Sequence, residues 1–420
     1  MAGARADIRA TRPRRSHSPG GAGPPRSRSR VRTSLRHRWK DEIRERSPES
    51  IQHGLARCLD GDPAPLVERW GASGLIERAA CEACELGVGG PLDEALRARR
   101  VRLPASAQII LDEHRRHLGA SHRRRSACLR PILRALREAG VPTLLLKGAA
   151  LNATVYAADD LRGMSDIDLL IRQEDSARAD RILDSLGCCR ESEPLHEGLF
   201  PRFYYERPYL TPDRPALRLD VHVRPFRPVH YRQTVPAEAM WLAPRRITVA
   251  DEPAWTPSVE ETLIHLCVHA AGHGLSQLRW LHDVVRFCEH EAGRIDFDRV
   301  NRLASAWRLS YPMSLAVRRI EEVFPMRFAG FADLLQPSPA SHPSLKDRIA
   351  IHQAPHDAAR PLRHVFVDLL CLPGVRDRAA YLHMHLFPGA GHLHPGATAP
   401  NAFAWLRAQS RRLIRALARG

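Results

Sequence analysis

The sequence predicts a protein of the α+β or α/β class, in which a small mixed β-sheet core is flanked by α-helical N- and C-terminal regions. Helical periodicity dominates residues 42–140 and returns after residue 257. Between them, residues 141–250 contain short apolar runs that are separated by proline-rich turns, a pattern typical of strands. With 420 residues, the chain is long enough for two or three domains.

Positive charge is concentrated at the N-terminus. The chain has a formal net charge of +17, and residues 1–40 supply +11 of it through twelve Arg or Lys and one acid. We expect residues 1–41 to be a disordered basic tail, because a segment rich in Arg, Ser, Pro and Gly buries too little apolar surface to offset its ordering entropy. The tail has no apolar stretch of the kind found in secretory signals. A nucleic-acid-binding arm, a transit peptide, and a dispensable extension or over-long start stay open.

The apolar runs and the cysteines indicate where in the cell the protein is located. No run approaches the roughly 18 apolar residues that a membrane span needs, so we expect a soluble protein with no membrane span. Nine cysteines in a chain without an export signal indicate reduced thiols, and we predict a cytoplasmic location. Cys81 and Cys84 form a C-x-x-C pair without a second pair, which favours two small buried residues over a zinc or redox site.

The helical lead-in covers residues 42–140. Breakers at 61–65 and 87–91 divide it into short helices, and a helix over Cys128–Ala139 ends at Gly140, the usual place for a glycine after a helix. In the core, we predict a helix at 149–156, a loop at 157–163 and a helix at 176–186. The predicted strands of the core are 142–148, 166–172, 203–210, 216–224 and 246–249.

Helices return at Ser258, which is predicted to be an N-cap, with Glu261 three residues later completing a capping box. The predicted helices are 258–272, 276–291, 297–325, 345–353, 361–386 and 400–418. The last of them has a basic face and an apolar face, so it could lie on a membrane or on nucleic acid. Docking of the apolar face on the parent domain is the favoured interpretation.

Two carboxylates, Asp166 and Asp168, stand at the start of the second predicted strand. Residues i and i+2 of a strand share a face, so these two side chains point together while Ile167 and Leu169 take the other face. Carboxylates on a rigid strand suit Mg²⁺, which keeps its remaining positions for water and substrate phosphates. An isolated Asp-x-Asp pair is more often solvated, so its context has to decide.

A third carboxylate, Asp220, occurs in a later strand, where it shares a face with His222 and Arg224. If this strand lies beside the first, the three aspartates form a triad that can bind two metal ions. Asp220 could also act as a general base for an attacking hydroxyl.

The ordered motifs Leu144–Leu151, Arg162–Leu170 and Asp220–His222 resemble those of a poorly characterised bacterial nucleotidyltransferase family. That family is part of the polymerase-β-like nucleotidyltransferase superfamily, and the resemblance covers roughly residues 105–330. It implies a nucleotidyltransferase core at 141–250, a helical subdomain at 251–330 that packs on the active site, and a C-terminal helical region at 331–420.

The resemblance also implies roles for particular residues. The catalytic and metal-binding residues, for Mg²⁺ or Mn²⁺, would be Asp166, Asp168 and Asp220. The nucleotide-binding residues would be Lys147, Gly148, Arg162, Ser165 and His222. A glycine at a helix N-terminus lets backbone N–H groups approach phosphates, and a lysine adds a point charge. Arg162 could instead brace the two aspartates by charge. Ala149 stands where the wider superfamily has a serine, so one phosphate contact is missing.

Three histidines at a spacing of four, His265, His269 and His273, share a helix face and could bind zinc if the helix persists past Gly272. The resemblance extends over His269, His273, Trp280 and Asp283, and it implies that they belong to helices beside the nucleotide site. We therefore predict that His269, His273 and Asp283 line the cleft.

The sequence thus predicts a metal-dependent enzyme of the nucleotidyltransferase type that moves an NMP group, AMP above all, from an NTP such as ATP to a hydroxyl-type acceptor and releases pyrophosphate. The acceptor stays open among small molecules, peptides or proteins, and RNA. One alternative is a nucleic-acid-binding protein that uses residues 1–40 and the C-terminal helix. Another is a catalytically silent nucleotide-binding or antitoxin-like partner.

Overall fold

A computed structural model describes residues 50–191, 195–335, 343–352 and 361–389. The chain divides into two units, residues 1–50 and 51–420, and all the elements below belong to the second. The basic tail and the predicted helix at 400–418 lie outside the described residues. Among the described helices, none combines the length and the apolar character that crossing a bilayer requires.

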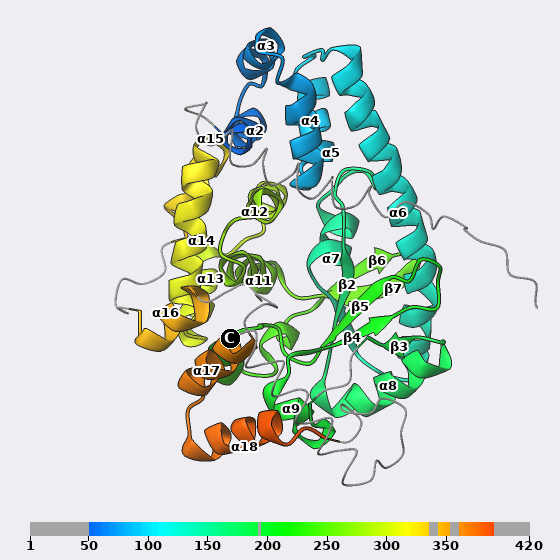
Figure 1. Cartoon of the computed structure of the whole chain (residues 1–420), viewed down its shortest axis with the longest axis vertical. Coiled ribbons are helices and arrows are strands. Elements are labelled where there is room, and N and C mark those ends of the chain that lie inside the picture. Colours follow the sequence, from blue (N-terminus) through cyan, green and yellow to red (C-terminus); the bar gives the residue numbers. More distant parts are fainter. Residues whose placement is uncertain (1–49, 192–194, 336–342, 353–360, 390–420) are drawn as a thin grey trace, which may run out of the picture. The chain divides into compact units, whose positions relative to one another are not determined.

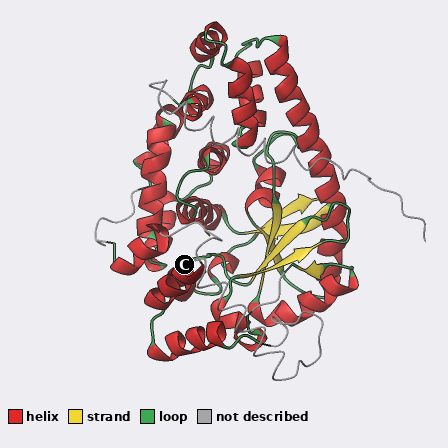
Figure 2. Cartoon of the chain, in the orientation of Figure 1, coloured by secondary structure: helices red, strands yellow, loops and turns green. Residues whose placement is uncertain are grey.

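A mixed sheet of seven strands confirms the predicted fold class, and it lies among helices (Figures 1 and 2). The strand order is β3-β4-β5-β2-β1-β7-β6. The central strands β2 and β5 are parallel, and β1 is antiparallel to β2. The strands are β1 (Thr143–Leu145), β2 (Asp166–Ile171), β3 (Cys189–Arg190), β4 (Glu206–Leu210), β5 (Arg218–His222), β6 (Arg245–Val249) and β7 (Glu252–Thr256).

The sheet is longer than the sequence predicted, because β3 and β7 were not expected. β7 follows β6 in a tight hairpin and pairs with β1, so the sheet reaches Thr256, beyond the expected core boundary at residue 250. The hairpin turns at Ala250 and Asp251, which both have positive φ. Neither residue is a glycine, so the usual sequence signal for such a turn is missing.

The lead-in consists of α2 (Ile51–Asp60), α3 (Ala64–Ala72), α4 (Ile76–Glu85), α5 (Gly89–Ala98) and α6 (Ala105–Glu138). The predicted helix at 128–139 is the last part of α6, a single helix of 34 residues that continues through Pro131. Its apolar side chains Leu129 and Leu133 are buried with the strand residue Ile167 in one hydrophobic cluster. Gly140 ends the helix with φ +67°, as predicted.

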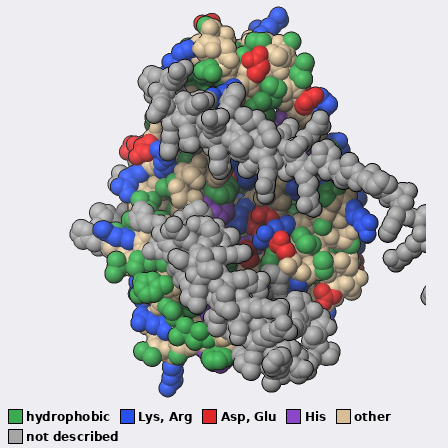
Figure 3. Space-filling view, in the orientation of Figure 1, with side chains coloured by type: hydrophobic (Ala, Val, Ile, Leu, Met, Phe, Trp, Pro, Cys, Tyr) green, Lys and Arg blue, Asp and Glu red, His purple; other side chains and the backbone are tan. Residues whose placement is uncertain are grey.

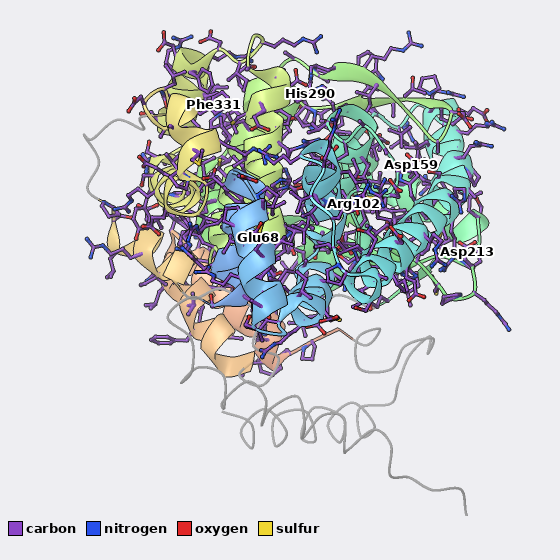
Figure 4. The ribbon with its side chains drawn as sticks, turned by 90° about the horizontal axis from the view of Figure 1, so that it is seen from above. Glu68, Arg102, Asp159, Asp213, His290 and Phe331 are labelled. Atoms are coloured by element: carbon purple, nitrogen blue, oxygen red, sulfur yellow. The ribbon has the colours of Figure 1, made fainter. Side chains whose placement is uncertain are left out.

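The lead-in helices hold the loop that enters β2. A Cβ on Gly90 of α5 would lie 2.3 Å from the carbonyl oxygen of Leu161, so only glycine permits this contact. Arg115 of α6 binds Asp93 of α5 and Asp160 of the loop. Figure 4 looks onto this end of the unit, where Glu68 of α3 is labelled. The aspartate strand therefore starts from a fixed loop.

Short helices in and around the core are α7 (Lys147–Thr154), α8 (Ser176–Ser185), α9 (Phe200–Phe203) and α10 (Val229–Thr234). The later helices are α11 (Val259–Gly272), α12 (Leu278–Glu291), α13 (Phe297–Ala306), α14 (Ser310–Val323), α15 (Pro325–Ala332), α16 (Leu345–His352), α17 (Pro361–Cys371) and α18 (Val375–Leu386).

The capping box of Ser258 and Glu261 at the start of α11 is confirmed. Two predicted helices were wrong in their continuity. The one at 297–325 is interrupted after α13, where Arg308 adopts φ +58°, and the one at 361–386 is interrupted between α17 and α18. Pro373 and Gly374 stand at the second break, and both disfavour helix interiors.

Candidate active site

The three aspartates meet because β2 and β5 are neighbours. Asp168 lies directly opposite Asp220 in the parallel ladder, and Asp166 lies opposite Arg218. All three aspartates line a cleft of about 480 Å³. Figure 3, in the orientation of Figure 1, shows acidic, basic and histidine side chains gathered at a hollow near the centre of the view. The other predicted residues that line the cleft are Lys147, Gly148, Arg162, Ser165, His269, His273 and Asp283.

Lys147 and Asp168 form a buried ion pair, with Nζ 2.7 Å from Oδ1. Burial by itself would lower the pKa of Lys147, but the Asp168 carboxylate outweighs it and the pKa is raised. Burial likewise opposes ionisation of Asp168, yet the charge of Lys147 and the bond from His222 hold the pKa of Asp168 far below its ordinary value. Asp168 is therefore a permanent anion at neutral pH.

The backbone at Lys147 is strained, since φ is +45° and the residue is not glycine. Lys147 is also the first residue of α7, so it lies at the helix N-terminus instead of at the end of the predicted strand. Strain of this kind persists only where the surrounding structure enforces it, and it occurs often at functional sites.

His222 contacts Asp168 but is not among the residues that line the large cleft. Its Nε2 is 2.8 Å from Oδ1 of Asp168, and its side chain is buried. Because Asp168 is ionised and can only accept, Nε2 carries the hydrogen and donates a hydrogen bond to Oδ1. On the other side, Nδ1 is 3.5 Å from Oε2 of Glu206. The structure thus gives His222 a contact with Asp168, whereas the sequence analysis assigned it to the nucleotide.

Asp220 is buried beside Glu206, and its Oδ1 accepts a hydrogen bond of 2.8 Å from Nε of Arg218. Burial and the negative charge of Glu206 raise the pKa of Asp220 to about 6, and the Arg218 guanidinium only partly offsets them. The carboxylate of Asp220 therefore has less positive charge around it than that of Asp168.

Arg162 and Asp283 form a second buried pair. The guanidinium makes two bonds of 2.8 Å to the two carboxylate oxygens, and the Tyr156 hydroxyl donates a third bond to Asp283. Arg162 also explains Gly148, because a Cβ there would lie 2.6 Å from Nη1 of Arg162 and 2.7 Å from Met164. The direct carboxylate partner of Arg162 is Asp283, while Asp168 interacts with Arg162 by charge alone.

His269, His273 and Trp280 form a cluster of three rings in the wall of the cleft. Their centroids are 4.6–4.9 Å apart. Burial lowers the pKa of His269 well below its ordinary value, and burial together with the charge of Arg227 lowers the pKa of His273 to about 4. Both rings are neutral at pH 7, so they can donate and accept hydrogen bonds or contact a planar ring.

A zinc site on the histidine face is not formed. His265 lines the same small pocket as His269 and His273, but its Nε2 bonds to the Pro225 carbonyl, and α11 ends at Gly272. Within residues 50–389, apart from the gaps already given, no group of three or more His, Cys, Asp or Glu side chains is arranged to hold a metal. This includes the three aspartates, of which Asp168 is bound by the Lys147 ammonium in this conformation.

The sequence analysis missed several residues of the cleft wall. They are Tyr204, Tyr205, Glu206, Arg218, Arg227 and Arg279. Glu206 could have been found from strand alternation, because it is the first residue of β4 and faces His222 of β5 in the ladder. Arg227 stands in the loop between β5 and α10, and Arg279 lies on α12. No periodic pattern indicates a site at either position.

Comparisons with known proteins add the following. No curated protein sequence matches the chain. The solution structure of the antibiotic-resistance factor ANT(2″)-Ia is similar, with 17% identity and a TM-score of 0.33, over 45% of this chain and 94% of that one. The crystal structure of ANT(2″)-Ia in complex with adenylyl-2″-tobramycin is similar as well, with 18% identity and a TM-score of 0.33. The likeness covers 44% of this chain and 98% of that one. With TM-scores this low, the likeness supports no statement about function.

A family model described as "Uncharacterised nucleotidyltransferase" matches residues 76–325. The match starts at α4, includes all seven strands and ends at the beginning of α15. It therefore contains every residue that was predicted to be catalytic. Because the match spans more than half of the chain, this protein belongs to that family of nucleotidyltransferases and is a transferase enzyme.

Proposed function

We propose that the enzyme transfers the AMP group of ATP to a hydroxyl-type acceptor and releases pyrophosphate, using a divalent metal ion held by Asp166, Asp168 and Asp220. The register of β2 and β5 is the observation that supports this most, because it sets Asp168 opposite Asp220 at the same cleft. Catalysis would then rest on positioning and charge neutralisation, as in other phosphoryl-transfer sites.

Carboxylate oxygens are the donors that a hard cation prefers, although the three side chains as they stand, with Lys147 at Asp168, are not yet arranged around one. Oδ1 of each aspartate is engaged, by Ser165, by Lys147 and His222, or by Arg218. Among the described residues, Oδ2 of each has no hydrogen-bond partner, so three carboxylate oxygens are free for Mg²⁺ or Mn²⁺. Such an ion would neutralise phosphate charge and acidify the attacking hydroxyl. Because it would compete with the ammonium of Lys147, we expect Lys147 to turn toward the phosphates.

The nucleotide has room on the α7 side of the cleft. Nε of Arg279 is buried and has no hydrogen-bond partner among the described residues. Beside the loop that enters β2, a pocket of about 110 Å³ contains Arg125, His122 and Asn152. Arg125 is close enough to Asp166 for that carboxylate to stabilise its charge. We assign this basic pocket to the pyrophosphate end of the nucleotide, and the rings around Trp280 to the base.

Asp220 has the properties of a proton acceptor. A general base works best when its pKa lies near the operating pH, and the pKa of Asp220 is raised to about 6. At pH 7 it is mostly ionised and can take the proton of the attacking hydroxyl, either directly or while it holds the metal. His222 keeps Asp168 oriented when Lys147 turns toward the phosphates.

The test is nucleotide transfer by the purified full chain, with radiolabelled ATP, Mg²⁺ and a fractionated metabolite extract as acceptor source. Asp166→Asn and Asp168→Asn should reduce labelled product and pyrophosphate by at least 100-fold. Asp184→Asn, on the exposed face of α8, is the matched control and should leave both unchanged. Binding of Mn²⁺ measured by calorimetry provides a readout besides activity. Equal product from all four proteins would disprove the aspartate mechanism.

A further inference from the structure

A second cavity, of about 320 Å³, adjoins the cleft. It lies among α9, α10, α17 and α18. Of these, α9, α17 and α18 are labelled in the same part of Figure 1. The cavity and the cleft share Tyr204, Tyr205 and Arg227 in their walls. A molecule in this cavity would therefore have one end at the nucleotide site.

The wall of this cavity is mostly apolar and aromatic. Phe203 and Tyr381 meet edge to face with centroids 5.2 Å apart, and Val229 and Met384 are buried in the same hydrophobic cluster. A cavity of this size and character suits a small organic molecule. A polyhydroxylated sugar or a nucleic-acid backbone would leave its polar groups without partners there, which is costly.

The polar groups of the cavity give it an excess of positive charge. Arg232 donates from Nη1 to the Phe203 carbonyl, while its Nε is buried and has no hydrogen-bond partner among the described residues. Burial lowers the pKa of Arg232, and the charge of Asp368 only partly opposes this shift. Arg227 forms no ion pair within the described part of the chain. Among the described residues of the wall, Asp368 is the one carboxylate, and it accepts a bond of 2.6 Å from the Tyr381 hydroxyl.

We propose that this cavity is the acceptor site, and that the acceptor is a small amphiphilic molecule with an apolar or aromatic body, one carboxylate that pairs with Arg232, and a hydroxyl that reaches the cleft past Tyr205. The assignment rests on the proposed function. In the reaction, the acceptor oxygen bonds to the α-phosphorus of ATP while the bond to pyrophosphate breaks. The hydroxyl proton passes to Asp220 or to water.

The experiment measures binding separately from chemistry. The full chain is titrated by calorimetry with a panel of hydroxylated aromatic carboxylates, with their primary amides, and with a polycationic amino sugar. Met384→Trp fills the cavity, and Leu382→Trp, at an exposed position of the same helix, is its matched control. Arg232→Met removes the charge, and Asp168→Asn disables the cleft without touching the cavity.

We expect at least one acid to bind at least tenfold more tightly than its amide. This binding should persist in Leu382→Trp and Asp168→Asn and be lost in Met384→Trp and Arg232→Met. With ATP and Mg²⁺, the wild type should convert that acid to its adenylylated product. Equal binding of acid and amide, preference for the amino sugar, or no binding by the whole panel overturns the proposal.

Failure of this proposal is distinguishable from failure of the proposed function. If ATP is turned over with an extract component but no bound acid is ever adenylylated, the acceptor assignment is wrong and the nucleotidyltransferase stands. If an acid binds in the cavity but no acceptor elicits pyrophosphate release, both assignments fail, because a cavity without chemistry is no acceptor site.

Discussion

The ammonium of Lys147 and the imidazole of His222 bind the same oxygen, Oδ1 of Asp168, at 2.7 and 2.8 Å. Both partners are donors, and the carboxylate is buried between them. Oδ2 of Asp168 consequently stays available toward the cleft. The site is organised around the permanent charge of Asp168, and the left-handed backbone of Lys147 is part of the cost of that arrangement.

Removal of the ammonium should harm both stability and activity. Lys147→Met keeps the length of the side chain but leaves Asp168 with a buried, poorly compensated charge. Losing one partner of a buried pair costs about 3–5 kcal/mol, so we expect the free energy of unfolding measured in urea to fall by that amount and the midpoint to move to lower urea. Nucleotide transfer should fall at least 100-fold. An unchanged urea midpoint together with normal nucleotide transfer would show that the ion pair contributes neither to stability nor to activity.

Transfer should depend on pH through Asp220. Its pKa in the folded protein is raised to about 6, so the active carboxylate is present above that pH and is lost as the pH falls through it. We expect kcat/KM to fall about tenfold per pH unit below 6. Because the charge of Glu206 raises this pKa, Glu206→Gln should move the midpoint to lower pH. A midpoint that does not move would exclude Asp220 as the titrating group.

Replacement of aspartate by asparagine should have opposite effects on the free energy of unfolding at Asp220 and at Asp168, which face each other in the β2–β5 ladder. Because the pKa of Asp220 is raised, its ionised form costs the fold roughly 1–3 kcal/mol at pH 8, and this cost disappears as the pH falls below the unfolded value. Asp220→Asn, which still accepts from Arg218, should therefore be inactive but more stable than wild type at pH 8, with no advantage near pH 4.

Asp168→Asn should instead be destabilised at pH 8, because the pKa of Asp168 is lowered and its ionised form stabilises the fold. Urea unfolding of both variants at pH 4 and pH 8 checks the pair of predictions. Destabilisation of equal size in both variants at pH 8 would contradict the difference in their surroundings.

The buried pair of Arg162 and Asp283 should act through stability more than through nucleotide binding. Asp283→Ala leaves an unpaired guanidinium and should cost about 3–5 kcal/mol. The double variant Arg162→Met with Asp283→Leu should recover much of this loss. If the sequence-based role of Arg162 on phosphates is correct, the double variant will lose ATP affinity by more than tenfold. A change below about threefold, which we expect, assigns Arg162 to the structure of the cleft.

Deletion of residues 1–40 should leave transfer to a small acceptor unchanged, because every described residue of the cleft lies after residue 146. If the tail binds nucleic acid, the deletion will reduce affinity for RNA or DNA in a salt-dependent manner. Gel-shift and transfer assays on the same preparation separate the two properties. Loss of transfer in the truncated protein would mean that the tail takes part in the chemistry.

Local patterns in the sequence determined a large part of the fold and of the candidate site. The alternation around Asp166 and Asp168 predicted one shared face, and the ladder between β2 and β5 brought Asp220 to it. The capping box of Ser258 and the glycine after α6 were also correct. These features depend on neighbours within a few residues, so periodicity and capping chemistry are sufficient to predict them.

Tertiary structure alone decided which side chains bind one another. Lys147 meets Asp168 from 21 residues away, and Arg162 meets Asp283 from 121 residues away. The cavity around Arg232 draws its wall from α9, α10, α17 and α18. Such pairings depend on strand register and on how helices pack over the sheet, and neither is encoded in a window of ten residues. The sequence by itself thus determined that the aspartates share a face, and the packing decided what holds them and what adjoins them.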